Sequence, residues 1–504
     1  MQYPTKPNQI SKRKPNQISK RININCSCNI FINLLLLLYT VSIQFSENLG
    51  MNNKTKLLSS VQDDNAVAFL RDLVAAQPKG ENAVQAMISD RLARAGCEVS
   101  SVDYEPSTVP VIGELIVKGT CNVGTRRAIV ATLHGDPSLP SLLMFAHPDG
   151  EPVTDTETWT HHPFSGEIDD GRIYGWGVAD DLAGCAAAVL AIEKVAASNV
   201  PMGRAVFAST PSKHYARGIA ALLHKGLRAD AALYLHPAES GVGMQEIKAV
   251  ASGQVEFEIK IHGEAPKTTE PGHTAFSHLA VNPLDKAVVL HGALMELAED
   301  RAQRIRHPLI EAEVGRATNL HISGIRCGEM IKFSRIVELC EMGGAISFPP
   351  GETLDQIKGE VEEAVLAASI SDEWLNLNRP EITWVTGVTG GEVPADHPLY
   401  ITASTAVTAV TGKPPHVNPL HTCSDIRNPI VEAGIPCVGL GCLGGDLSQN
   451  GRHDEWIDLA DFLNMVDVTA KVVTDWCSGD HPKLFHPQRP ADRVKISPTI
   501  KDIQ

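Results

Sequence analysis

Three short apolar segments of this sequence each end in a polar residue. They are LLMFAH, which ends at His147, AVFAST, which ends at Thr210, and AALYLH, which ends at His236. Runs of this length and composition are typical of strands buried on both faces of a sheet. A segment with helical composition and period, residues 181–197, separates the first two. The alternation predicts an α/β fold with a mixed, mostly parallel sheet and polar residues at the carboxyl ends of its strands.

A block with a different pattern begins at Val255. Alternating polar and apolar residues there predict a strand, and the segment 282–299 that follows predicts a long helix. A second strand is expected near 319–324, and a further helix after the sequence PPGETLDQ. The block therefore predicts an inserted α+β domain over residues 253–371.

The first pattern returns from Pro394 onward, so the large domain is predicted to be discontinuous. A chain of 504 residues is also longer than the ~100 to 200 residues of one typical domain. We expect residues 51–252 and 372–480 to form one large catalytic domain. Residues 481–504 are expected to be a tail, and residues 1–50 a leader or a non-native extension.

The first fifty residues differ from the sequence that follows. KPNQISK occurs at 6–12 and again at 14–20, and an apolar run with five consecutive leucines follows at 30–43. A basic segment before a short apolar run is typical of a secretory signal or anchor, although this run is too short for a stable membrane span. The alternative is that the protein begins at Met51. The location is then cytoplasmic, whereas a genuine signal in 1–45 would make the protein secreted or anchored.

Charge and cysteine usage exclude some functions. A net charge of −15 argues against a nucleic-acid partner, because binding phosphates needs clustered Lys and Arg. The 11 cysteines include no C-x-x-C pair, so neither a disulfide framework nor a zinc ribbon is indicated. These features fit a cytoplasmic protein with reduced thiols.

The segment from Leu142 to Glu193 carries the residues with the clearest chemistry. His147 follows a predicted strand, and Asp180 and Asp181 come just before a predicted helix. Histidine and carboxylate suit zinc, cobalt or manganese, and one Asp can bridge two ions. Asp149 is better placed to orient His147 than to bind metal. The ordinary alternative is a loop histidine at 147 and a helix N-cap at 180.

The residues between these positions resemble a known family. After H-x-D comes W-x-x-x-P-F-S-G-x-I-D-D-G-R-I-Y-G-x-G-x-x-D, which is similar to the acetylornithine deacetylase, succinyl-diaminopimelate desuccinylase and carboxypeptidase family of metal-dependent hydrolases. The matching residues are Trp159, Pro163, Phe164, Gly166, Gly171, Tyr174, Gly175, Gly177 and Asp180. The resemblance continues over residues 64–475. It implies a zinc-peptidase-like large domain, a lid domain, and one or two divalent ions (Zn, Co or Mn) with His147 and Asp180 among the ligands.

The resemblance also implies roles for residues further along the chain. Gly272-His273 followed nine residues later by Asn282 resembles the family's lid motif. In that motif the histidine reaches across a homodimer and polarises the scissile carbonyl. Arg427, in SDIR, resembles a position that holds a substrate carboxylate, for which its bidentate fork is suited. Asn282 and Trp176, which stands where the family most often has Arg, are expected to contact substrate.

The sequence departs from the family after the second predicted strand. Typical members have a Glu-Glu pair there, which supplies the general base and a metal ligand. This chain has Ser212, Lys213 and His214, so the base is unassigned. His236 stands where the family has an acidic ligand, and His214 would replace the second Glu if the loop is shifted by one residue. The alternatives are a re-tuned metal site and a site that has lost its second ion or both ions.

Two further positions are shifted or altered. The family's last histidine ligand would fall at Gly451, so His453, two residues later, is the candidate ligand. Asp181 stands where an apolar residue is usual. It is a candidate substitute acid or base, and the alternative is a solvated helix N-terminus.

The leading hypothesis is a metal-dependent hydrolase of a C–N, amide-like bond, a deacylase or peptidase. Its substrate would be small and carboxylate-bearing, such as an N-acyl amino acid or a dipeptide. One alternative is an aminohydrolase of aromatic amines within the same family. Another is a catalytically weakened member that binds a small ligand or a partner, which rests on the missing Glu-Glu pair.

Overall fold

The computed structural model describes residues 63–481, with gaps at 117–122, 151–152, 154–155, 214, 237–240, 271, 420–423 and 445–452. The expected leader, most of the tail and His214 therefore lie outside the described residues. Contacts divide the chain after Asp64, and the unit that begins at Asn65 is described below. None of the helices in the described ranges is long and apolar enough to cross a membrane.

The larger sheet contains the three strands expected from the apolar segments. In the described part of the chain it has eight strands, in the order β1 (Glu98–Tyr104), β3 (Arg126–Leu133), β7 (Ala205–Ser209), β4 (Leu142–Ala146), β8 (Ala231–Leu235), β17 (Cys437–Leu440), β9 (Glu246–Lys248) and β16 (His416–Asn418). β4 runs parallel to β7 and β8, and β17 runs parallel to β8. β1, β3 and β7 pair antiparallel. The mixed α/β fold with parallel central strands is confirmed.

Helices cover both faces of this sheet, and the alternation of side chains along β4 shows how. Leu142, Met144 and Ala146 pack in one core cluster, and Leu143 and Phe145 pack in another. The first cluster includes side chains of α2 (Glu81–Arg94), α3 (Ala183–Ser198), α9 (Pro398–Thr411) and α11 (Leu459–Cys477). The second includes those of α4 (Gly218–His224), and α10 (Arg427–Ala433) packs beside it. Because both faces are covered, the central strands are apolar throughout, as their sequences indicate.

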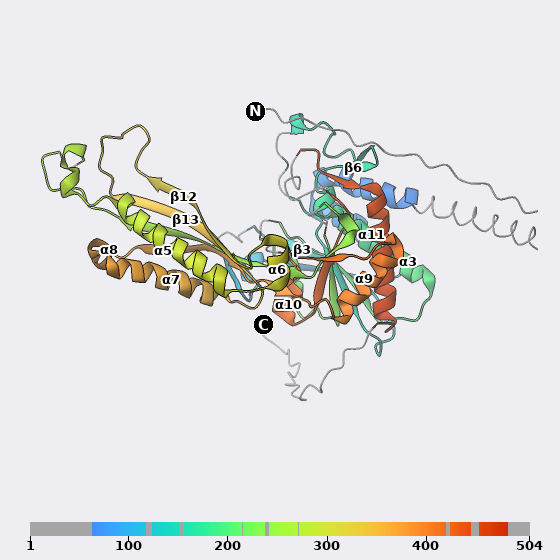
Figure 1. Ribbon diagram of the computed structural model, residues 1–504. Coiled ribbons are helices and arrows are strands. Elements are labelled where there is room, and N and C mark those ends of the chain that lie inside the picture. The colour runs from blue at the N-terminus through green and yellow to red at the C-terminus, as the bar shows by residue number, and fades with distance from the viewer. Residues whose placement is uncertain are drawn as a thin grey trace, which may run out of the picture. The chain divides into compact units, whose positions relative to one another are not determined.

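A second, antiparallel sheet forms the smaller lobe (Figure 1). Its order among the described residues is β12 (Asn319–Cys327), β13 (Leu339–Phe348), β11 (Gly253–His262), β14 (Glu381–Val388) and β2 (Glu114–Ile116). The helices α5 (Pro283–Arg304) and α7 (Leu354–Ser371) pack on one face of it. The sheet thus takes β2 and β14 from outside residues 253–371. The domain limits given by the sequence remain a proposal.

A small sheet joins two distant parts of the chain beside the larger sheet. It consists of β18 (Trp456–Asp458), β6 (Arg172–Tyr174) and β5 (Glu167–Asp169). Trp456 pairs with Tyr174, and the backbone N–H of Gly175 donates to the carbonyl of Glu455 at 2.9 Å. This pairing brings the segment Asp454-Glu455-Trp456 against the segment that leads to Asp180.

Candidate active site

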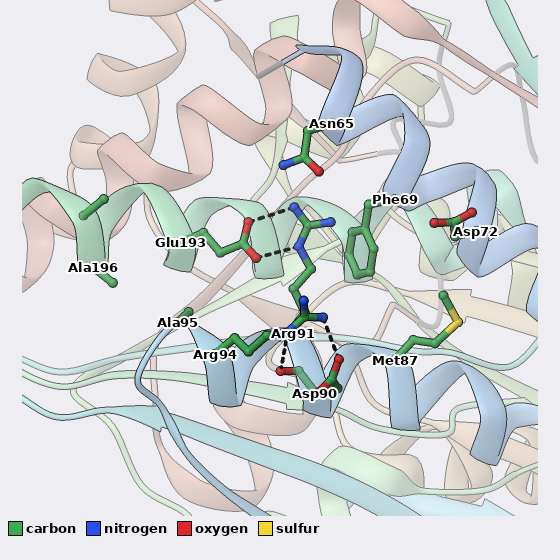
Figure 2. Close-up of a pocket in the computed structure, with 11 residues that line it drawn as sticks. Asn65, Phe69, Asp72, Met87, Asp90, Arg91, Arg94, Ala95, Glu193 and Ala196 are labelled. Carbon is green, nitrogen blue, oxygen red and sulfur yellow. Dashed lines mark hydrogen bonds and ion pairs between the residues drawn. The ribbon is translucent and has the colours of Figure 1, made fainter. Parts of the chain in front are cut away.

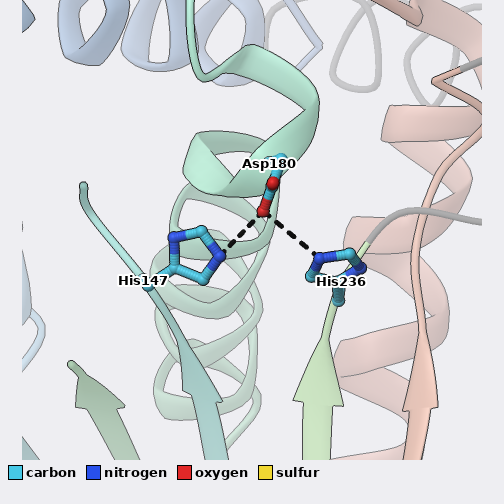
Figure 3. A group of neighbouring side chains, drawn as sticks. All are labelled: His147, Asp180 and His236. Atoms are coloured by element: carbon cyan, nitrogen blue, oxygen red, sulfur yellow. Dashed lines mark ion pairs between the residues drawn. The ribbon is translucent and has the colours of Figure 1, made fainter. Parts of the chain in front are cut away.

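His147, Asp180 and His236 meet at the carboxyl edge of the larger sheet (Figure 3). His147 follows β4 and His236 follows β8, and these neighbouring parallel strands end side by side. Asp180 lies in η4 (Val178–Leu182), just before α3. Its Oδ1 is 2.8 Å from Nε2 of His147 and 3.2 Å from Nε2 of His236. All three are buried, and among the described residues they form the one group of three or more ligand-type side chains close enough to hold a metal ion.

The ring of His147 is oriented as a metal ligand would be. Its Nδ1 lies 2.8 Å from the backbone carbonyl of Asp149, which can only accept, so Nδ1 carries a hydrogen. Nε2, which faces Asp180, therefore carries a lone pair when the ring is neutral and a second proton when the ring is charged. Burial disfavours the charged ring, but the carboxylate of Asp180 outweighs it and raises the pKa of His147 to about 9. The space beside Asp180 favours a positive charge, from a proton or from an ion.

His236 is held differently. Nζ of Lys248 lies 2.9 Å from Nδ1 of His236, and both side chains are buried. An ammonium group only donates, so Nδ1 accepts and the hydrogen of the neutral ring is on Nε2, facing Asp180. His236 can bind an ion through Nε2 when that hydrogen leaves. The three residues therefore fit one divalent ion, with a rearrangement of protons at His236.

The second oxygen of Asp180 is paired with a lysine. Nζ of Lys213 forms an ion pair with Oδ2 of Asp180, and the two side chains are 17% and 9% exposed. Burial opposes ionisation of Asp180, but Lys213 and His147 together hold its pKa well below the usual range. The sequence shows Lys213 in place of the expected carboxylates but does not indicate this pairing.

Asp149 fixes the loop that carries Lys213. Its Oδ1 accepts from the backbone N–H of Ser212 at 2.9 Å, and its Oδ2 accepts from that of Lys213 at 3.0 Å. Arg126 donates to the same Oδ2 at 2.9 Å. The carboxylate of Asp149 thus holds this loop, while its backbone carbonyl, rather than its side chain, orients His147.

Glu455 organises the backbone that carries Asp180, a contribution that the sequence does not predict. Its carboxylate is fully buried and accepts the N–H groups of Gly177, Ala179 and Asp180 at 3.0, 2.8 and 3.1 Å. Burial, followed by the nearby charge of Asp180, raises the pKa of Glu455 to about 7. The signal available in the sequence is a glutamate directly before a buried strand, which needs donors for its oxygens.

Asp181 contacts the backbone of His147. It is 1% exposed, and its Oδ2 accepts from the backbone N–H of His147 at 3.3 Å. Burial, with the charge of Asp180 added, raises its pKa well above the usual value. Asp181 is therefore buried and not the solvated helix terminus that the sequence offered as an alternative.

His453 is not brought into the group around Asp180. Its Nε2 lies 2.7 Å from Oγ1 of Thr158, and its ring packs edge-on against Trp159. His214, the other candidate ligand, lies outside the described residues.

Arg427 has protein acceptors where a substrate carboxylate was expected. The side chain is buried, and its Nε and Nη2 donate to the carbonyls of Thr389 and Ile112 at 2.9 and 2.6 Å. Nη1 donates to the side chain of Asn428 at 2.7 Å. These contacts join α10 to two loops, so within the described residues the guanidinium serves the fold.

The lid residues make local contacts in this chain. Nδ1 of His273 accepts from the N–H of Ala275 at 3.1 Å, at the start of η6 (Thr274–Leu279). Asn282 caps α5 by accepting from the N–H of Leu284 at 3.1 Å. Neither belongs to the group around Asp180. The role of His273 across a dimer stays a prediction.

Trp176 lies beside the loop that follows His147. Its ring would lie 3.0 Å from a Cβ added at Gly150, and it packs edge-on against Phe164 with centroids 5.9 Å apart. The indole Nε1 is buried and has no acceptor among the described residues. Its expected contact with substrate stays a prediction.

A separate surface pocket of about 730 Å³ lies on the outer side of α3 (Figure 2). Arg91 crosses it and donates to both carboxylate oxygens of Glu193, at 2.5 and 2.9 Å, with the ring of Phe69 beneath the guanidinium. Its main charged groups are paired with each other. It contains none of the residues around Asp180, so the cluster and not this pocket is the candidate active site.

Comparisons with known proteins identify the family of this chain. The sequence model of Peptidase family M20/M25/M40 matches residues 143–475. A curated relative, the N-formyl-4-amino-5-aminomethyl-2-methylpyrimidine deformylase of Bacillus subtilis (strain 168), is 23% identical over 411 residues, which cover 78% of this chain and 89% of the relative.

Solved structures of M20 proteins share the fold. The M20 metallo-carboxypeptidase Sso-CP2 of Sulfolobus solfataricus is 15% identical, with a TM-score of 0.58 over 82% of this chain and 98% of that one. Human carnosine dipeptidase 1 is 16% identical, with a TM-score of 0.54 over 83% and 98%. A dinuclear metal-binding M20 peptidase of Bacillus subtilis is 14% identical, with a TM-score of 0.53 over 83% and 99%. With the three-residue cluster, these matches support the use of a divalent metal. The chain belongs to Peptidase family M20/M25/M40, as a divergent hydrolytic enzyme of that family.

Proposed function

We propose that this enzyme hydrolyses a C–N, amide-like bond in a small carboxylate-bearing substrate, such as an N-acyl amino acid or a dipeptide. The observation that carries the proposal is the convergence of His147, Asp180 and His236 at the carboxyl edge of the larger sheet. In open α/β sheets this edge is where ligands bind.

The names of the relatives support the bond class. They refer to removal of a formyl group from nitrogen, to a dipeptidase and to a carboxypeptidase. Breaking an amide-type bond is common to these names, although the molecules attached to the bond differ. On this basis we assign cleavage of an amide-type bond, and a small substrate, to this chain.

The chain's own residues would hold the metal and arrange its surroundings. Zinc, cobalt or manganese at His147, Asp180 and His236 would act as a Lewis acid on the amide carbonyl and on water. The backbone carbonyl of Asp149 fixes the ring of His147, and Glu455 fixes the backbone that presents Asp180. In this proposal, His273 of the second copy in a cytoplasmic homodimer polarises the scissile carbonyl.

The carboxylates around the cluster narrow the choice of general base. Asp181 is buried, its Oδ2 accepts from the backbone N–H of His147, and burial raises its pKa, so it keeps its proton to a higher pH than an ordinary carboxyl group. Asp149 is engaged by Arg126 and two backbone N–H groups. We therefore assign positioning roles to both and leave proton transfer to a group outside these two.

The test is hydrolysis by the purified chain after loading with zinc, cobalt or manganese. A panel of N-acyl amino acids and dipeptides is expected to give turnover that a chelator abolishes. His236→Ala is expected to lose bound metal and activity together, whereas His224→Ala, a matched change at an exposed histidine at the end of α4, keeps both. Metal-loaded protein that hydrolyses nothing on the panel, yet binds one of its compounds, would indicate a binding protein instead.

A further inference from the structure

We propose that the ammonium group of Lys213 takes the place of a second metal ion at Asp180, so that this centre holds one divalent ion and one lysine. The single ion rests on the proposed function, whereas the charge carried by Lys213 does not. A dinuclear metal-binding peptidase is among the structures that share this fold. The difference proposed for this chain is that Lys213, and not a second ion, neutralises the second oxygen of Asp180.

The two oxygens of Asp180 face different groups. Oδ1 lies 2.8 and 3.2 Å from the two histidine nitrogens, and Oδ2 is paired with Nζ of Lys213. A carboxylate that bridges two cations offers one oxygen to each of them. Here one oxygen faces the group that can hold an ion, and the other already has a positive charge beside it.

Lys213 is placed by the backbone and does not merely reach in from the surface. Its own N–H and that of Ser212 donate to the two oxygens of Asp149, which in turn is paired with Arg126. The hydroxyl of Ser212 donates to Asp425 at 2.8 Å. Because the backbone of Lys213 is already fixed at several points, pairing with Asp180 costs only the freedom of the side chain and no further ordering of the loop.

The surrounding charges explain why a cation is needed there. Asp180 is buried, and its negative charge raises the pKa of the neighbouring carboxyl groups of Asp181 and Glu455. An unpaired buried carboxylate is strongly unfavourable. A lysine supplies this positive charge as part of the chain, whereas a second ion would supply it only when bound.

The first experiment is thermal unfolding of the full chain with metal removed by a chelator. Lys213→Met is expected to lower the unfolding midpoint by about 3 to 5 °C, because it leaves Oδ2 of Asp180 without its cation. Lys225→Met changes an exposed lysine after α4 and is expected to leave the midpoint unchanged. Equal midpoints for wild type and Lys213→Met would overturn the proposal.

The second experiment counts bound ions by equilibrium dialysis against excess manganese. Wild type is expected to saturate at one ion per chain, and Lys213→Glu, which replaces the ammonium by a ligand, at two. Lys213→Gln has a similar size but no charge to attract an ion and is expected to stay at one. Two ions in wild type would overturn the proposal, and so would a Lys213→Glu protein that stays at one.

The two proposals fail in distinguishable ways. If wild type binds no ion and hydrolyses nothing, the proposed function is wrong, but a lowered midpoint in metal-free Lys213→Met still supports the lysine as the cation of Asp180. If wild type hydrolyses its substrate with two ions bound, the function stands and the lysine proposal falls.

Discussion

Nζ of Lys248 lies 2.9 Å from Nδ1 of His236 and donates a hydrogen bond to it. In most metal-binding histidines the corresponding nitrogen instead donates its hydrogen to an acceptor. Lys248→Gln would place a carbonyl oxygen within reach of Nδ1, which moves the ring hydrogen there and leaves Nε2 as a lone pair for the ion. We expect about tenfold tighter metal binding, within the range typical of such outer partners. Calorimetric titration with zinc measures it.

Lys248→Met is the matched control, because it removes the donor without supplying an acceptor. Its affinity for zinc should rise less than that of Lys248→Gln. A Gln variant that binds more weakly than both wild type and Met would show that Lys248 does not set the hydrogen position on His236.

The raised pKa of Glu455 predicts how the free energy of unfolding depends on pH. Its pKa is about 7 in the folded chain and close to 4.5 when unfolded, so the folded state binds more protons between these values. Its contribution to the free energy of unfolding is therefore fully present below about pH 4.5 and falls as the pH rises to about 7. Urea unfolding of metal-free protein from pH 5 to 8 measures this.

The contribution of Glu455 is isolated by comparison with Glu455→Gln. The substitution removes the titrating group, so the difference in stability between wild type and variant should change across this pH window and become constant above it. A difference that is constant from pH 5 to 8 would contradict a raised pKa.

A substitution at Arg427 tests whether this side chain stabilises the fold or binds substrate. Arg427→Lys keeps the charge but cannot reach the carbonyls of Ile112 and Thr389 together, and we expect it to cost about 2 to 4 kcal/mol of unfolding free energy. KM of the surviving folded enzyme should change little. A large rise in KM with unchanged stability would restore the carboxylate-binding role expected from the sequence.

Gly184 allows α3 to approach the sheet. A Cβ added there would lie 1.9 Å from the carbonyl oxygen of Leu235 and 2.5 Å from Oδ1 of Asp181, so Gly184→Ala should destabilise the fold by more than about 3 kcal/mol. Gly292→Ala is the control in a helix, since nothing lies within 4 Å of its added Cβ. It should stabilise the chain by up to about 1 kcal/mol. Denaturant unfolding compares the two, and equal effects would contradict the close approach of α3.

The main strands and the helix after Asp180 were predictable because burial on both faces leaves a continuous apolar run. The expected placement of His147 and His236 came from the rule that polar residues gather where parallel strands end, and Asp180 was expected just before a helix. These arguments are local, since each uses one strand or helix and the residue next to it. They identify side chains that approach the same edge of the sheet.

The environment of the cluster was not predictable in this way. The pairing of Lys213 with Asp180 and the contact of Lys248 with His236 depend on the directions of long side chains from different strands. The acceptors of Arg427 come from loops that are distant in the sequence. A motif gives the residue type at such positions, but only the packed structure shows which partner uses it.

The pairing of β2 with β14 affects whether the smaller lobe can exist by itself. β11 lies between β13 and β14 in that sheet, and β14 lies between β11 and β2. A fragment limited to residues 253–371 would lack β14 and β2, which leaves one side of β11 as an unpaired edge along most of its length. Such an edge is a template for joining other chains. Excision of the lobe at these limits would therefore yield a self-associating fragment, and a soluble version would have to carry strands from both flanks of the insertion.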